Sequence, residues 1–176
     1  MMKEYYLNTD NINEWVDILC AGDRVYLSGT IYTARDAAHK KIVSLINNNE
    51  ALPFVLEGAL IYYAGPTGTK EGMVIGSIGP TTSSRMDKFA PLLLDNGLKA
   101  MIGKGNRDSA VIDAMRRNNA VYFAALGGCG ALYAGCVEEC AVIAFPELGC
   151  ESVKKLTVKD FPLMVAVDSS GNSLYK

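Results

Sequence analysis

Three turns of this chain are rich in glycine, serine or threonine and lead directly into an arginine and a predicted helix. The turns span residues 27–39, 78–87 and 102–108. Their arginines are Arg35, Arg85 and Arg107. A cation in the first turn of a helix meets the positive end of the helix dipole, which is mildly unfavourable. Because helix N-termini bind anions, the pattern favours a negatively charged partner. The alternative is three capped helices with solvated Arg–Asp neighbours, and spacing alone leaves both open.

Strand-like apolar runs alternate with helical runs, and this alternation predicts an α/β fold. Strands are expected over residues 72–78, 98–102 and 120–125, with helices over 85–96 and 108–118 between them. A β-α-β-α-β order favours parallel pairing. The early and late segments are predicted to be antiparallel. The result is a single domain over residues 1–176 with a mixed sheet.

The remaining elements are shorter. Strands are predicted over residues 24–27, 54–63, 142–145 and 155–158, with a terminal hairpin of 163–167 and 173–175. Thr33 and Asp36 have the spacing of a capping box, so a helix is expected to start at Thr33. Ligands of α/β folds bind outside the carboxyl ends of parallel strands, and the turns after residues 78 and 102 are predicted to leave such ends.

Charge and hydropathy exclude several classes of partner. The net charge of −2 gives no bulk field for nucleic acid or for an anionic membrane, so any anion site must be local. No apolar stretch approaches the length of a membrane span, and the first residues lack the pattern of a signal peptide. We therefore expect a cytoplasmic protein.

The chain has five cysteines, an odd number that argues against a disulfide framework. Cys136 and Cys140 are spaced C-x₃-C rather than C-x₂-C, and the single histidine, His39, is far away in sequence. Together with Cys129, these cysteines are interpreted as buried, inert thiols, and no metal ligand is predicted in this chain.

The residues that remain suit small carboxylates. No Walker motif, G-x-G-x-x-G or G-x-S-x-G sequence is present. Arg35 and Arg85 can each bind a carboxylate through two parallel hydrogen bonds, and Lys104 lies between two glycines where a ligand can approach closely. Arg107 is a weaker candidate that we expect to be solvated. The Thr81 hydroxyl follows a Gly-Pro turn, where it caps a helix or orients a substrate.

His39 lies one helical turn after Arg35, so the two share a face of the predicted helix. We favour a structural or indirect role for His39 over direct proton transfer. The residues therefore predict an anion-binding domain whose catalytic set is incomplete.

Several segments carry a resemblance to a known family. They are T-x-RDAAH at 33–39, GPTT-x-x-RMD at 79–87, GKGNR at 103–107, PELG at 146–149 and DFP at 160–162. The chain resembles the β subunit, or C-terminal domain, of class I iron–sulfur hydro-lyases, which include fumarate hydratases and L-tartrate dehydratases.

The resemblance implies a swivelling β/β/α domain in a hetero-oligomer. It implies a 4Fe–4S cluster that is held by cysteines of a partner α subunit and not by this chain. Arg35, Arg85 and Lys104 would then bind the dicarboxylate substrate. Thr81 would be catalytic, taking part in proton transfer with an acidic residue of the partner.

The leading hypothesis is reversible hydration of fumarate to (S)-malate, a reaction of the tricarboxylic acid cycle, by this chain together with its α subunit. The sequence of residues 103–107 resembles that of fumarases more than that of tartrate dehydratases. L-tartrate dehydration is an alternative in the same class, and a non-catalytic anion-binding module is an alternative of a different class.

Overall fold

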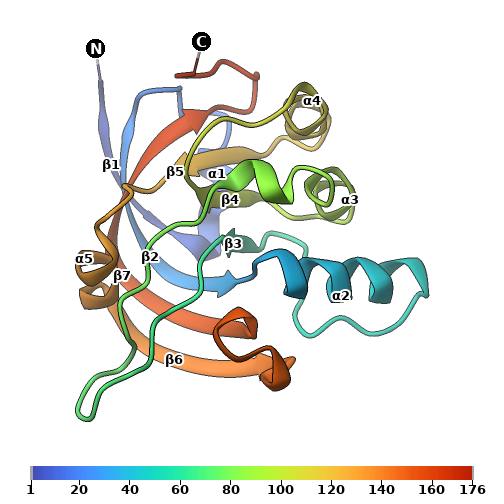
Figure 1. The fold of residues 1–176 in the computed structure, drawn as a ribbon. Helices are drawn as coiled ribbons and strands as arrows, with labels where there is room; N and C mark the ends of the chain where they lie inside the picture. The colour runs from blue at the N-terminus through green and yellow to red at the C-terminus, as the bar shows by residue number, and fades with distance from the viewer. Residues whose placement is uncertain (1, 176) are drawn as a thin grey trace.

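Seven strands form one mixed sheet that closes on itself in the computed structural model, which describes residues 2–175 (Figure 1). The strands are β1 (Glu4–Asn8), β2 (Arg24–Thr33), β3 (Leu60–Tyr62), β4 (Ala100–Gly103), β5 (Val121–Ala124), β6 (Val137–Ala144) and β7 (Val153–Val167). Their order is β1-β2-β3-β4-β5-β7-β6, and an additional β2–β7 pairing closes β2, β3, β4, β5 and β7 into a barrel. Strands β1 and β6 lie outside this closure as edges.

Parallel pairing runs from β1 through β5, and β7 is antiparallel to β2, β5 and β6. The predicted mixed sheet is therefore confirmed. The early strand predicted over 24–27 lies in β2, which is antiparallel to β7 as expected but parallel to β1 and β3, so the prediction of an antiparallel early segment holds only on one side of β2. The connection between β1 and β2 contains the short helix α1 (Ile12–Trp15) and is a crossover rather than a hairpin turn.

The helices lie on two sides of the barrel. Helices α2 (Asp36–Asn47), α3 (Ala90–Asp95) and α4 (Ser109–Arg117) cover one side, and α5 (Gly130–Gly135) lies on the other (Figure 1). Three 3-10 segments complete the set, at Thr9–Asn11, Ser83–Met86 and Pro146–Glu151. No helix within residues 2–175 is long and apolar enough to cross a membrane.

Alternate residues of the short central strands pack into two different cores. Leu60 and Tyr62 of β3 belong to one hydrophobic cluster, which also contains Tyr133 of α5. Ile61 belongs to the other, with Ala38 and Ile42 of α2. Since side chains alternate across a strand, this arrangement buries both faces of β3 and explains why its sequence is continuously apolar.

Two local predictions fail because distant partners outweigh local signals. Thr33 does not cap a helix: it lies in β2, where its hydroxyl accepts from the Lys154 N–H (3.1 Å) and donates to the Ser152 carbonyl (3.4 Å). The N-cap of α2 is Arg35. The run 72–78 forms no strand but an irregular loop, since no neighbouring strand pairs with it.

Other boundaries shift in the same way. The helix predicted over 85–96 divides into the 3-10 segment Ser83–Met86 and α3, which has a proline in its first turn. The strands predicted over 155–158 and 163–167 are one long strand, β7, and Asp160 within it has a φ of 49° beside a register shift against β2. Of the predicted terminal hairpin only the single bridge Val167–Ser173 is formed.

Candidate functional site

The turns that carry Thr81 and Lys104 lie side by side where strands β3 and β4 end. Lys104 follows β4 directly. The loop that carries Thr81 returns to the end of β3, where the Thr81 N–H donates to the Tyr63 carbonyl at 2.7 Å. The next residues pair with the β4 end: Thr82 bridges Lys104 in parallel, and the Ser83 N–H donates to the Lys104 carbonyl at 2.9 Å. The backbone therefore places the threonine hydroxyl and the lysine side chain on neighbouring turns of one rim.

Arg35 and Arg85 converge on the N-terminus of α2. The Arg85 guanidinium contacts Asp36 through Nε–Oδ1 (3.0 Å) and Nη2–Oδ2 (2.8 Å). Arg35 Nη2 lies 3.4 Å from Oε1 of Glu151, whose other oxygen accepts from the Ala37 N–H at 2.9 Å. Both predicted carboxylate-binding cations are thus already paired with carboxylates of this chain. The Arg85–Asp36 pair, in which the arginine side chain is 48% exposed, is of the accessible kind that contributes little and can be exchanged for a ligand at small cost. The Arg35–Glu151 pair is more shielded, with both side chains 22% exposed, so its exchange costs more.

Two glycines lie beside the cationic side chains. A Cβ on Gly65 would lie 2.9 Å from the Cys150 carbonyl oxygen and 3.3 Å from Cδ of Arg35, so a side chain here would press on the backbone of Cys150 and crowd the arginine. A Cβ on Gly127 would lie 3.7 Å from the Lys104 ammonium, which is an ordinary van der Waals contact. That ammonium has no ion-pair partner within residues 2–175, which leaves it free to meet an anion.

Arg107 is not solvated, and in this respect the sequence prediction is wrong. Its side chain has 0% exposure, and its Nε contacts Asp87 Oδ1 at 2.6 Å. The guanidinium carbon lies 5.3 Å from the ring centre of Tyr63 and 5.0 Å from that of Tyr122. Burial opposes the charge of Arg107, but the neighbouring Tyr63 and Asp87 nevertheless raise its pKa. The third turn therefore directs its arginine into the protein, not toward a ligand.

His39 lies in the protein interior next to the backbone of Arg35, and not on the rim. It is fully buried, its Nδ1 is 2.9 Å from the Arg35 carbonyl oxygen, and its ring stacks on Phe89. Burial lowers the pKa of His39 to about 4, so the ring is neutral at pH 7. Since a carbonyl only accepts, Nδ1 carries the proton and donates it to Arg35. This arrangement supports the indirect role favoured from the sequence.

The cysteines do not form a metal site within this chain. Cys129, Cys136 and Cys140 are free and only partly buried, and burial raises the pKa of Cys136 and of Cys140. Across residues 2–175, no group of three or more histidine, cysteine, aspartate or glutamate side chains is placed to hold a metal ion. The described residues do not fit an iron–sulfur cluster.

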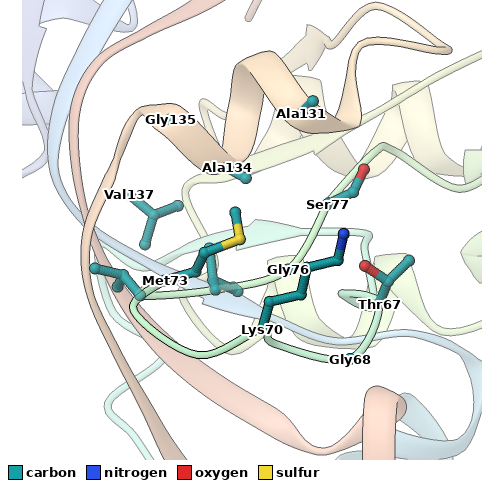
Figure 2. Close-up of a pocket in the computed structure, with 12 residues that line it drawn as sticks. Thr67, Gly68, Lys70, Met73, Gly76, Ser77, Ala131, Ala134, Gly135 and Val137 are labelled. Atoms are coloured by element: carbon teal, nitrogen blue, oxygen red, sulfur yellow. The ribbon is translucent and has the colours of Figure 1, made fainter.

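A separate cavity of about 490 Å³ lies between the loop that follows β3 and helix α5 (Figure 2). Lys70, Thr67 and Ser77 lie toward one end of it, and Met73 and Val137 lie toward the other. None of the four predicted site residues lines it.

The geometry first defines a class: an α/β barrel domain that presents arginines, a lysine and a threonine hydroxyl near the carboxyl ends of its parallel strands. The particular assignment follows from comparison with known proteins. The chain belongs to the family described as Fumarase C-terminus, whose model matches residues 1–176.

Individual relatives agree with this assignment. The chain is 40% identical over 168 residues to "Fumarate hydratase 2" of Leishmania major, covering 94% of this chain and 30% of the relative. It is 40% identical over 155 residues to "Fumarate hydratase class I, aerobic" of Escherichia coli K12, covering 87% of this chain and 28% of the relative. The chain thus spans less than a third of the length of these hydratases.

A relative of similar size also matches. The protein named "Putative L(+)-tartrate dehydratase subunit beta" of Methanocaldococcus jannaschii is 44% identical over 164 residues, which cover 90% of this chain and 84% of the relative. The family resemblance seen in the sequence is therefore confirmed, and both hydratases and a dehydratase subunit are among the relatives.

Proposed function

We propose that this chain is the β subunit of a two-subunit hydro-lyase that interconverts fumarate and (S)-malate. The observation that carries the proposal is the juxtaposition of the Thr81 and Lys104 turns through the Ser83–Lys104 hydrogen bond (2.9 Å). Arg35 and Arg85 supply cations at the neighbouring end of α2. One rim thus offers ligands for carboxylates and a hydroxyl for proton transfer. Longer relatives that are named fumarate hydratases support this class of reaction.

Each residue has a distinct proposed task. Lys104, which has no internal partner among the described residues, binds a substrate carboxylate directly. Arg35 and Arg85 bind a substrate carboxylate, which takes the place of their internal partners Glu151 and Asp36. Thr81 moves a proton at the reacting carbon, together with an acidic group of the partner. The 4Fe–4S cluster belongs to the α subunit in this proposal, because the described residues offer it no ligand set.

Two other functions have specific support. One relative, of which the match covers 84%, is named "Putative L(+)-tartrate dehydratase subunit beta", which supports tartrate as an alternative substrate. The non-catalytic anion-binding module is supported by Lys104, which has no ion-pair partner within residues 2–175 and could hold an anion without any reaction.

Assay of the chain with and without its partner tests the proposal. We expect the purified chain alone to show no hydratase activity and no stoichiometric iron, because its site is incomplete. Anaerobic reconstitution with the cluster-bearing subunit should produce turnover of fumarate, assayed beside L-tartrate to separate the two substrates. Iron–sulfur absorbance on this chain alone that Cys129→Ala abolishes would contradict the assignment, as would a reconstituted complex that turns over neither compound.

Replacement of Lys104 by alanine should weaken substrate use strongly in the reconstituted complex. Each hydrogen bond to a charged group is worth about 1.5–3 kcal/mol, so kcat/KM should fall roughly tenfold to a hundredfold. Alanine at the exposed Lys159 is the matched control and should leave kcat/KM unchanged. Equal values for Lys104→Ala and Lys159→Ala would remove Lys104 from the site.

The arginines need a further control because each has an internal partner. Asp36→Asn weakens the Asp36–Arg85 ion pair but leaves the cation in place, whereas Arg85→Ala removes the cation as well. If Arg85 binds substrate, Arg85→Ala should lose far more kcat/KM than Asp36→Asn. Similar losses in both variants would mean that Arg85 serves only the ion pair. The corresponding pair for Arg35 is Glu151→Gln and Arg35→Ala.

A further inference from the structure

The hydroxyl of Tyr122 connects the two turns that carry Thr81 and Lys104. Tyr122 lies on β5, and its side chain is fully buried. Its hydroxyl donates to the Gly105 carbonyl at 2.8 Å and lies 2.9 Å from Oγ of Ser83. Gly105 follows Lys104 in sequence, and Ser83 lies two residues after Thr81. One phenol group thus spans both halves of the candidate site.

Proton counting fixes the direction of this chain of bonds. A tyrosine hydroxyl has one proton, and the Gly105 carbonyl can only accept it. The Ser83 hydroxyl must therefore donate to the Tyr122 oxygen. Burial raises the pKa of Tyr122, so the phenol stays protonated and the order Ser83 to Tyr122 to Gly105 is maintained at neutral pH. Hydrogen bonds in series polarise and strengthen one another in such a buried setting.

The position of Ser83 is narrowly defined. A Cβ on Gly103 would lie 2.0 Å from the Ser83 hydroxyl and 3.0 Å from the Tyr63 ring, so the end of β4 accommodates Ser83 only because residue 103 is glycine. The Ser83 N–H is bonded to the Lys104 carbonyl, so Ser83 contacts the Lys104 turn directly and through Tyr122.

A buried ion pair forms a second connection between the same two turns. Asp87 lies just after the segment of Ser83, and Arg107 lies just after Gly105. Their side chains form the buried pair at 2.6 Å, and the second Asp87 oxygen accepts from the Asp108 N–H at 2.9 Å. The Arg107 guanidinium lies over the Tyr122 ring, which orients the phenol. The pair joins the second and third turns, while the phenol sets their separation next to Thr81 and Lys104.

We propose that Tyr122 is a positioning residue that holds the Thr81 hydroxyl and the Lys104 ammonium at a fixed separation for the reaction. The inference rests on the proposed function of the rim, but the connection itself does not. Reacting groups displaced by about 1 Å can lose on the order of a hundredfold in rate, so a change that leaves the fold intact can still reduce turnover.

The connection is tested first on the chain alone. Tyr122→Phe removes the phenol oxygen and keeps the ring. We expect amide hydrogen exchange of Ser83 to accelerate by about tenfold relative to the wild type. The Ser83 N–H is hydrogen-bonded to the Lys104 carbonyl, and without the phenol oxygen the two turns lose the contact that stabilises this bond. Tyr133→Phe is the matched control: its buried hydroxyl also makes two hydrogen bonds, with the Leu126 N–H and the Pro162 carbonyl, away from the Ser83 turn. Exchange at Ser83 that changes equally in both variants, or in neither, would overturn the connection.

The functional consequence is tested in the reconstituted complex. We expect Tyr122→Phe to lower kcat/KM by about tenfold to a hundredfold, and Tyr133→Phe to have little effect at a similar loss of melting temperature. Ser83→Ala should add little to Tyr122→Phe, since both remove the same chain of bonds. Wild-type kcat/KM in Tyr122→Phe with accelerated Ser83 exchange would overturn the positioning role. A wild-type complex without hydro-lyase activity would instead refute the proposed function, and Ser83 exchange would still decide the connection.

Discussion

Replacing Thr81 by valine is expected to abolish most turnover while leaving the fold intact. General acid–base groups contribute about 10²–10⁴-fold, so kcat of the reconstituted complex should fall by that order. The backbone placement should survive, because it depends on the Thr81 N–H bond to Tyr63 (2.7 Å) and not on the hydroxyl. KM should change much less, since Lys104 and the arginines remain. Steady-state kinetics and a thermal melt on one preparation measure both quantities.

The adjacent threonine provides the control for this experiment. Thr82, not Thr81, is the N-cap of the 3-10 segment Ser83–Met86, and its side chain makes no capping bond. The capping role considered for Thr81 from the sequence is therefore not formed in the structure. Thr82→Val should leave kcat unchanged. A normal kcat in Thr81→Val, whatever its melting temperature, would disprove the catalytic role of Thr81.

Replacing Arg107 by methionine should produce the largest loss of stability. The change leaves the Asp87 carboxylate buried without its cation, and breaking a buried pair in this way costs about 3–5 kcal/mol. The free energy of unfolding, measured by urea titration of the chain alone, should fall by that amount.

Arg117 gives a matched comparison. Its guanidinium contacts Asp95 through two bonds, at 2.8 and 2.7 Å, but it lies on the surface of α4. Arg117→Met should therefore cost far less than Arg107→Met, although its ion pair has the more regular geometry. Equal losses in the two variants would show that burial does not determine the importance of the Arg107 pair.

Local sequence signals were sufficient for part of the fold. Helix α4 was anticipated to within a residue at each end, because Asp108 caps it through the Val111 N–H at 2.9 Å and its apolar face is regular. Strands β4 and β5 are short apolar runs joined by helix α4, and such a connection favours the parallel pairing that they form. The run 72–78 has the same apolar character but forms a loop. A strand needs a partner, and residues 72–78 have none in the sheet.

The candidate site shows the same division. The sequence by itself determined which residues are candidates for the chemistry: the family motifs contain Arg35, Thr81, Arg85 and Lys104, and the structure brings the Thr81 and Lys104 turns side by side. Only the tertiary structure decided that Arg107 is buried. Arg35 and Arg107 each follow a glycine-containing turn and precede an aspartate, so no local pattern separates them. Burial of a charge depends on a counter-charge and on rings that surround it, and Asp87, Tyr63 and Tyr122 come from three other places in the chain.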